Sequence, residues 1–555
     1  MPTIDVSYKD LCSLIGRQIE IQKLTNEDIL FAKGEVDGIA GDTIKIDSKD
    51  TNRPDLWSAE GVARQIRYKY RTGFPDYKTK KSSIVVNVDK SVNDVRPLTV
   101  CAVVRGLKIN DTVLSQLIQL QEKIAGTFGR NRKDVAIGVY DADKIKSPIR
   151  YTTVSPSGIK FVPLDFEKEL TPQEILEKHP KGKEFGHLLK GAQRYPVFID
   201  SANNVLSLPP IINSAYTGKV TEKTRNVFIE CSGFDFKFLT PSLNVIVTAL
   251  HERGGTIETV TVNYPGKKIE MPDLKPKKFT IDADYINKIS GLGLDKKAIV
   301  DLLTSFGYRA KMRGNKLDLL YPAYRQDMMH ARDVVEDVII SYGYNKIEPE
   351  AKELVTSGRM VEIEKFSGNV TDILIGCGLQ EIMSYTLTNK RDLFEKMNVD
   401  NEKIVEIENP VSANWSVFRS GLTPSIMDFL SKNKHVEYPQ KIFEIGNCTI
   451  PDEKMETRAK DIRKLAAGIS SPAVSYEDIS SILDALMKNL GMDYKLKKHE
   501  HRSFIAGRCA EIVVKNKNLG IIGEVHPIVL NRWKLEKPVV VFELDLSEVF
   551  AIKNK

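Results

Sequence analysis

Three polar stretches interrupt this chain of 555 residues and divide it into segments the size of single domains. One hydrophobic core rarely organises more than about 250–300 residues, and a typical domain holds about 100–200. The chain therefore needs several cores, and we expect a domain boundary near each stretch. The stretches are residues 73–83, 263–278 and 348–364. The expected domains are residues 1–80, 81–268, 269–347 and 348–555.

Short runs rich in β-forming residues alternate with helical patterns along the whole chain. The expected strands include residues 83–88, 98–104, 511–514 and 539–544. The expected helices include residues 58–70, 111–124, 296–306 and 331–342. Strands and helices mixed in this way predict a multidomain α+β protein with mixed sheets, and they argue against a single doubly wound sheet.

Composition excludes several classes of protein. No apolar run approaches the roughly 18–20 residues that span a bilayer, and the N-terminus lacks the pattern of a secretory signal. The six cysteines are far apart and none has CxxC spacing, which argues against a zinc ribbon and fits a reducing compartment. We therefore expect a cytoplasmic protein without a membrane partner. The net charge of +7 permits RNA binding but does not demonstrate it.

A capped amphipathic helix is expected after the sequence DTNRPDL, which begins at Asp50. Asp55 or Ser58 can cap this helix, because both side chains accept hydrogen bonds from free N–H groups at a helix start. Apolar residues line one face at helical spacing, and Arg64 and Arg67 lie mostly on the other. A solvated basic face is the favoured interpretation, and direct contact with RNA is the alternative.

Four acidic residues lie close together at the start of the helix expected over 331–342. Asp333, Glu336 and Asp337 stand at spacings that bring carboxylates together on a helix, and Asp327 lies in the preceding loop. Such carboxylates repel each other unless a cation neutralises them, and Mg²⁺ readily binds one or two carboxylates together with water. On spacing alone the favoured interpretation is simpler: acids near a helix N-terminus complement its dipole.

A single glutamate, Glu230, interrupts an apolar run that follows two prolines and a small polar cluster. In a strand, such a glutamate is either an outward-facing charge or a buried hydrogen-bond acceptor. Charged side chains are seldom fully buried, so the outward charge is the more common case.

Taken together, five segments resemble the phenylalanyl-tRNA synthetase beta-subunit family, in its archaeal and eukaryotic cytosolic branch. They occur in the same order as in that family and cover essentially the whole chain. The segments are DTNRPDLWSAEGVARQIR, RKDVAIGVYDADKIKSPIRY, PPIINS with the strand of Glu230, YRQDMMHARDVVEDVIISYGYNKI, and FRSGLTPSIM with FEIG.

The resemblance implies a role for each expected domain. Residues 1–80 become an N-terminal α+β domain, and residues 81–268 become a mixed-sheet editing domain that deacylates tRNA. Residues 269–347 become a small winged-helix-like metal-binding domain, and residues 348–555 become a degenerate class II synthetase-like module, an antiparallel sheet with helices. The implied editing pocket contains Asn213, Ser214 and Glu230. The implied Mg²⁺ ligands are Asp327, Asp333, Glu336 and Asp337.

The resemblance also implies partners. A beta subunit of this family works with an alpha subunit, as an α2β2 tetramer, to attach phenylalanine to tRNA(Phe), and the alpha subunit binds ATP and phenylalanine. The last third of this chain has no glycine-rich strand followed by the arginine that class II sites use on ATP, so no residue here is expected to catalyse aminoacylation. The expected activity is hydrolysis of mischarged Tyr-tRNA(Phe). A freestanding deacylase of mischarged tRNA and a pure RNA-binding scaffold remain alternatives.

Overall fold

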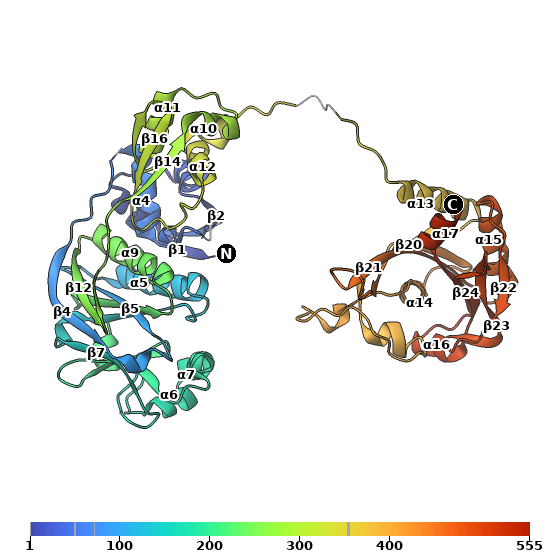
Figure 1. Cartoon of the computed structure of the whole chain (residues 1–555), viewed down its shortest axis with the longest axis horizontal. Helices are drawn as coiled ribbons and strands as arrows, with labels where there is room; N and C mark the ends of the chain where they lie inside the picture. The colour runs from blue at the N-terminus through green and yellow to red at the C-terminus, as the bar shows by residue number, and fades with distance from the viewer. Residues whose placement is uncertain (1, 49–51, 72, 352–355, 555) are drawn as a thin grey trace. The chain divides into compact units, whose positions relative to one another are not determined.

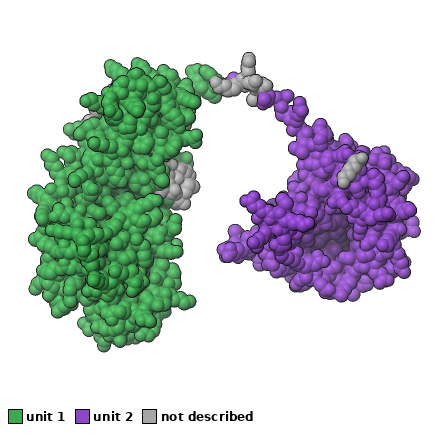
Figure 2. Space-filling model, in the orientation of Figure 1, with its two compact units in different colours: residues 1–350 green, residues 351–555 purple. Residues whose placement is uncertain are grey.

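The computed structural model describes residues 2–48, 52–71, 73–351 and 356–554. It contains two compact units, residues 1–350 and residues 351–555 (Figures 1 and 2). Asp50 of the first motif and residues 352–355 of the third polar stretch lie outside the described residues. Each unit is an α+β structure, and a mixed sheet forms the largest element of each. The predicted fold class is confirmed at this level.

Unit 1 begins with a three-stranded antiparallel sheet in the order β1-β3-β2. Its elements are β1 (Thr3–Ser7), α1 (Tyr8–Ile15), β2 (Gly34–Ala40), β3 (Thr43–Ser48) and α4 (Ala59–Tyr70). Ser58 caps α4 by accepting a hydrogen bond from the N–H of Gly61. Gly61 is required there, because a Cβ at this position would lie 1.6 Å from the carbonyl oxygen of Asp55.

Helix α4 is buried on nearly all sides, so the predicted solvated basic face is wrong. The guanidinium of Arg64 is buried and lies 3.7 Å from the centroid of the Tyr324 ring. Arg67 forms an ion pair with Glu252 at 2.7 Å. Both partners come from distant parts of the chain, which explains why the periodicity of α4 alone could not reveal them.

A ten-stranded mixed sheet forms the middle of unit 1, in the order β10-β9-β8-β7-β4-β12-β5-β11-β6, with β13 paired to β12. β4 runs parallel to β7 and β12, and the other pairs are antiparallel. The main strands are β4 (Lys80–Val88), β5 (Leu98–Arg105), β6 (Val135–Asp141), β7 (Ile149–Val154), β8 (Tyr195–Ile199), β9 (Val205–Leu208), β10 (Ile212–Asn213), β11 (Val227–Gly233) and β12 (Thr256–Tyr264).

Helices α5 (Asp111–Lys123) and α9 (Phe236–Glu252) cover one face of this sheet and lie between it and the N-terminal strands (Figure 1). The polar stretch 263–278 contains the end of β12, all of β13 (Lys267–Met271) and the start of β14 (Lys277–Asp282), and the domain boundary expected there stays a prediction. Its prolines lie outside these strands or at their ends, where they cost no ladder hydrogen bond.

The rest of unit 1 is a three-stranded antiparallel sheet packed against three helices. The sheet order is β14-β16-β15, with β15 (Arg309–Arg313) and β16 (Lys316–Tyr321). The helices are α10 (Ala283–Ser290), α11 (Lys296–Ser305) and α12 (Ala331–Tyr342). Helix α12 has the bounds that its apolar stripe predicts.

Unit 2 is built on a seven-stranded sheet in the order β17-β20-β21-β25-β24-β23-β22, in which only the β17–β20 pair is parallel among the described strands. Its long strands are β20 (Gln440–Pro451), β21 (Ala459–Ser470), β23 (Phe504–Val514), β24 (Lys517–Val525) and β25 (Val539–Asp545). Helices α13 (Glu362–Gly376), α15 (Tyr476–Asn489) and α17 (Leu546–Lys553) pack on one face. Helices α14 (Thr423–Lys432) and α16 (Pro527–Arg532) pack on the other.

All six cysteines are free thiols and five are buried. Among the described residues, no helix combines the length and the apolar character needed to cross a bilayer.

Candidate functional site

A pocket of about 450 Å³ opens beside β6, the last strand of the ten-stranded sheet. Helix α5, strand β6, residues 209–213 and Glu230 line it. The pocket lies where the two ends of the sheet meet. The Asn213 side-chain amide, on β10, donates to the carbonyl oxygen of Val139 on β6 at 3.3 Å, and Tyr140 on β6 contacts Ser207 on β9. Side-chain contacts from β6 to β9 and β10 therefore connect the two ends of the sheet. We call this connection the seam, and the pocket lies beside it.

Glu230 reaches this seam from strand β11. It stands opposite Cys101 on β5 and Gly138 on β6, and only 2% of its surface is exposed. Its interpretation as an outward-facing charge is therefore wrong. The reason is topological: β11 has a neighbouring strand on both sides, and the face that carries Glu230 is covered by buried aromatic side chains.

Only one oxygen of the Glu230 carboxyl group has a hydrogen-bond partner among the described residues. The hydroxyl of Tyr140 lies 3.2 Å from Oε1 and 2.8 Å from Oγ of Ser207. Oε2 is buried and accepts no hydrogen bond from them. Burial raises the pKa of Glu230 to about 7, against the opposing influence of Arg96. The pocket thus contains a buried acceptor that lacks a partner.

The raised pKa of Glu230 predicts a pH-dependent stability. The folded protein binds a proton at Glu230 more tightly than the unfolded chain, whose pKa is 4.5. This contribution is complete below pH 4.5 and is lost as the pH rises through about 7, a loss of about 3 kcal/mol in the free energy of unfolding. We expect Glu230→Gln to remove this loss. Denaturant unfolding of both proteins at pH 5 and pH 8 measures it; an equal decline in the variant would contradict the assignment.

Asn213 and Ser214, the predicted neighbours of Glu230, lie in different surroundings. Asn213 lines the pocket, and Gly218 packs so closely that a Cβ there would be 2.4 Å from the Cβ of Asn213. Ser214 is buried and caps the short helix α8 (Ala215–Gly218) by accepting from the N–H of Thr217 at 3.3 Å. The structure therefore brings Glu230 and Asn213 to the pocket, and it places the Ser214 hydroxyl in a cap.

Sequence reasoning missed three residues that shape the pocket: Tyr140, Ser207 and Arg132. The guanidinium of Arg132 donates to the carbonyl oxygens of Pro210 and Ile211 at 3.2 and 2.8 Å, and so holds the proline pair in place. Tyr140 belongs to the run VAIGVYD, which the sequence already marked as distinctive. Tyr140 and Gly138 are two residues apart, so they lie on the same face of β6. This spacing is the feature of the sequence from which the position of Tyr140 could have been predicted.

The acidic cluster at α12 is dominated by ion pairs inside the protein. Arg325 binds both oxygens of Asp327 and, through Nη1, Asp337 at 2.7 Å. The Lys33 ammonium lies 3.4 Å from Oδ1 of Asp337 and 3.2 Å from Glu336. Burial alone would raise the pKa of Asp327, but Arg325 and Arg53 hold it well below its ordinary value. These contacts join Lys33 and Arg53, from the N-terminal part of unit 1, to α12 and to the loop that precedes it.

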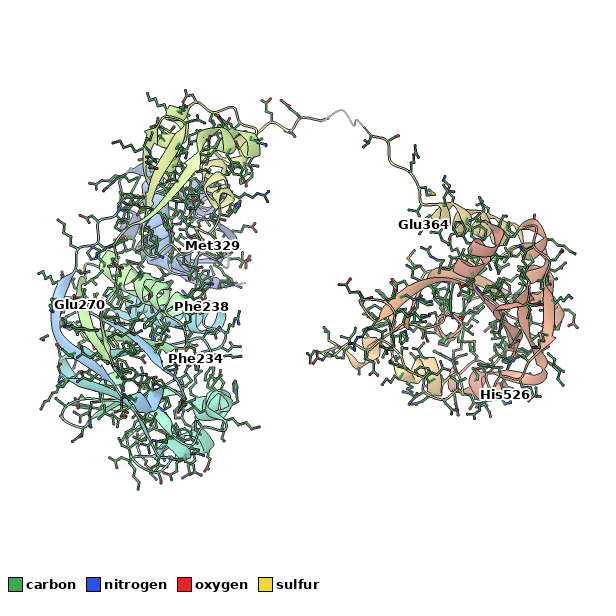
Figure 3. The ribbon with its side chains drawn as sticks, in the orientation of Figure 1. Phe234, Phe238, Glu270, Met329, Glu364 and His526 are labelled. Atoms are coloured by element: carbon green, nitrogen blue, oxygen red, sulfur yellow. The ribbon has the colours of Figure 1, made fainter. Side chains whose placement is uncertain are left out.

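Asp333 has a different role at the start of α12. Its Oδ2 accepts hydrogen bonds from the backbone N–H groups of Met329 and His330 at 2.8 and 2.6 Å, as one half of a capping box. Met329, labelled in Figure 3, is 79% exposed, so this end of the helix is near solvent. The side chain of Glu336 is 42% exposed.

As a set, the four acids do not fit one metal ion. Asp327 and Asp337 are already neutralised by Arg325, and the part of the chain that the structure describes contains no group of three His, Cys, Asp or Glu residues able to hold a metal. The buried Oδ1 of Asp337 accepts no hydrogen bond from the described residues. The Lys33 ammonium, 3.4 Å away, supplies the positive charge beside it. Only Asp333 and Glu336 reach solvent.

In unit 2, two positively charged side chains on or beside the sheet form ion pairs with carboxylates. Arg419 binds Glu444 at 2.6 Å and Oγ of Ser384 at 2.9 Å, and both charged side chains are buried. Lys464 binds Glu543 at 2.8 Å. Gly446 makes room for this arrangement, because a Cβ there would lie 2.1 Å from Nη2 of Arg419.

Three family models match the chain in order. The B3/4 domain matches residues 101–242, and the tRNA synthetase B5 domain matches residues 279–344. The phenylalanyl-tRNA synthetase beta chain CLM domain matches residues 347–546.

Relatives of known name match over the full length. The phenylalanine–tRNA ligase beta subunit of Pyrococcus abyssi is 50% identical over 557 residues, which cover 99% of this chain and 100% of the relative. The chain belongs to the phenylalanine–tRNA ligase beta-subunit family. The family member from Methanocaldococcus jannaschii is 40% identical over 553 residues, with 99% of this chain and 100% of the relative covered.

A solved structure supports the fold of this beta-subunit family member. An N-terminal fragment of the phenylalanyl-tRNA synthetase beta subunit from Pyrococcus horikoshii matches with a TM-score of 0.60 and 52% sequence identity. The match covers 62% of this chain and 100% of the fragment.

Proposed function

We propose that this chain works with an alpha subunit to attach phenylalanine to tRNA(Phe), and that its own pocket hydrolyses mischarged Tyr-tRNA(Phe). The observation that carries the second part is the buried, unpartnered Oε2 of Glu230 in a pocket of about 450 Å³. Leaving a buried acceptor without a partner costs free energy, so a ligand that donates a hydrogen bond there is favoured.

The selection rests on one hydroxyl group. A synthetic site shaped for phenylalanine discriminates only weakly, by about 10², against an analogue that merely adds a hydroxyl. A second site that requires the hydroxyl reverses the preference. The phenol of tyrosine donates to Glu230, whereas phenylalanine leaves the carboxyl group unpaired, and such sites reach about 10⁴–10⁵.

The reaction in this pocket is ester hydrolysis. Water attacks the ester carbonyl carbon, the bond to the ribose oxygen breaks, and the products are tyrosine and tRNA with a free hydroxyl. Glu230 selects the substrate in this scheme and does not act as the base. Asn213 is the polar neighbour best placed to orient the water, because its amide nitrogen is held by Val139 and its oxygen remains an acceptor.

The four-domain division follows as part of the proposal. Residues 1–80 and 81–268 correspond to the N-terminal α+β domain and the editing domain. The three helices and three-stranded sheet of residues 269–347 support a winged-helix-like domain. The largely antiparallel sheet with helices of residues 348–555 supports a synthetase-like module without its own catalysis.

The alpha subunit supplies the synthetic site in this account. Binding a triphosphate during adenylate formation requires cations aimed at the phosphates. Arg419 and Lys464 instead form ion pairs with Glu444 and Glu543. These pairs support a module that packs against another chain and does not bind a triphosphate itself. An α2β2 assembly, with ATP and phenylalanine bound by the alpha subunit, is the arrangement we propose.

We propose that two of the four acids, Asp333 and Glu336, are the Mg²⁺ ligands, because they are the two that reach solvent. One or two carboxylates, with water and a ligand from the alpha subunit, suffice for this ion. We expect the double replacement of Asp333 and Glu336 by alanine to shift the complex toward free subunits in gel filtration, and EDTA to act in the same direction on the unaltered protein. An intact complex in both experiments would refute a bridging metal.

One experiment separates the proposal from a freestanding deacylase. The chain is purified alone and co-expressed with the alpha subunit, and both preparations are assayed for ATP–pyrophosphate exchange and for deacylation of Tyr-tRNA(Phe). We expect exchange only with the alpha subunit, and deacylation by the complex. Efficient deacylation by the isolated chain would favour the freestanding enzyme. Exchange by the isolated chain would overturn the division of labour.

A further inference from the structure

We infer that Tyr140 is the positioning residue of this pocket: its hydroxyl holds Oε1 of Glu230 at the seam of the sheet, so that Oε2 is left for the ligand. The inference rests on the proposed hydrolysis of Tyr-tRNA(Phe) and deepens it. It explains how a single carboxyl group can have one satisfied oxygen and one unsatisfied oxygen in a fixed orientation.

The position of Tyr140 supports this role. Its side chain is fully buried, and its hydroxyl contacts Glu230 on the neighbouring strand β11 and Ser207 on β9, near the other end of the sheet. A tyrosine hydroxyl has one proton, which it gives to one acceptor at a time. Two acceptors lie within reach of the Tyr140 hydroxyl, Oγ of Ser207 at 2.8 Å and Oε1 of Glu230 at 3.2 Å, and the ionised carboxylate is the stronger acceptor.

Gly138 makes the arrangement possible. It stands on β6 directly opposite Glu230, and a Cβ at this position would lie 2.1 Å from the Tyr140 hydroxyl. The obstructing atom belongs to a buried aromatic ring, which cannot move aside as a flexible chain end could. A side chain at position 138 would therefore displace the hydroxyl that holds Glu230.

The other polar groups around Glu230 have partners elsewhere. Arg96 donates to Oγ of Ser232 and to backbone carbonyl groups of the loop before β6. The Tyr151 hydroxyl donates to the carbonyl oxygen of Arg96 at 2.7 Å, and the Cys101 thiol contacts Thr99. Arg96 acts on Glu230 through its charge, whereas Tyr140 makes a direct hydrogen bond to the carboxyl group at 3.2 Å, and the nearby Ser232 hydroxyl also lowers the pKa of Glu230.

The test compares Tyr140→Phe with Tyr151→Phe in the full complex. Both variants lose one buried hydroxyl from the same face of the sheet, but only the first loses the contact to Glu230. We expect Tyr140→Phe to lower kcat/KM for Tyr-tRNA(Phe) hydrolysis by about tenfold or more. We also expect it to move the midpoint of the pH profile upward, because the ionised carboxylate loses its donor. Tyr151→Phe should leave both unchanged.

A second variant keeps the test decisive if Tyr140→Phe does not fold. Gly138→Ala retains the tyrosine but displaces its hydroxyl, and we expect the same fall in hydrolysis, with phenylalanylation unaffected. If Glu230→Ala abolishes hydrolysis while Tyr140→Phe and Gly138→Ala behave like the unaltered protein, the positioning role is overturned and the proposed function stands. If Glu230→Ala itself has no effect, the proposed function falls.

Discussion

Replacing Glu230 by alanine is expected to let the assembled enzyme accumulate Tyr-tRNA(Phe) while it continues to form Phe-tRNA(Phe). The variant removes the only buried carboxyl group that lines the pocket among the described residues. Sites that require a hydroxyl discriminate by about 10⁴–10⁵, so we expect kcat/KM for Tyr-tRNA(Phe) deacylation to fall at least about 10²-fold. Deacylation of preformed Tyr-tRNA(Phe) measures this directly.

Glu230→Gln is the matched control for that experiment. Glutamine retains the size of the side chain and one oxygen acceptor but cannot ionise. We expect partial activity and loss of the pH dependence that a pKa of about 7 gives the unaltered protein, whose preference for tyrosine should strengthen as the pH rises through that value. Unchanged deacylation by both variants would remove Glu230 from the mechanism.

Replacing Arg325 by alanine is expected to cause the largest loss of stability. Arg325 is buried and binds two buried carboxylates, those of Asp327 and Asp337. Without it both acids lose their principal cation, and breaking a buried ion pair in this way costs about 3–5 kcal/mol. Thermal or denaturant unfolding of the full-length chain measures the loss.

Arg313→Ala provides the comparison for that result. Arg313 forms an ion pair with Asp318 in which both side chains are largely exposed, and such pairs contribute at most about 1 kcal/mol. If Arg325→Ala were no more destabilising than Arg313→Ala, the internal ion-pair network would have no structural importance. The acids would then be better explained as ligands awaiting a metal.

Local signals in the sequence predicted most of the local structure. The apolar stripe of residues 331–342 gave the bounds of α12, and the cap at Ser58 was confirmed. Alternation and β-branched residues located strands such as β4 and β25. These signals suffice because helix periodicity, capping and strand patterning depend on neighbours in the chain.

The surroundings of the charged residues could not be predicted in the same way. Glu230 is buried because β5 and β6 flank its strand, and Arg64 is buried because Tyr324 covers it. Lys33 and Asp337 meet although most of unit 1 separates them in the sequence. Such contacts arise from topology, which periodicity does not encode. The seam between β6 and β9 that positions Tyr140 belongs to the same class.

The most direct test of the account compares two substrates on the unaltered protein. Tyr-tRNA(Phe) and Phe-tRNA(Phe) are prepared separately, and their hydrolysis by the chain assembled with its alpha subunit is measured under single-turnover conditions. We expect the tyrosyl ester to be hydrolysed faster by about 10²-fold or more, because only its phenol satisfies Glu230. Equal rates for the two esters, or no hydrolysis of either, would contradict it.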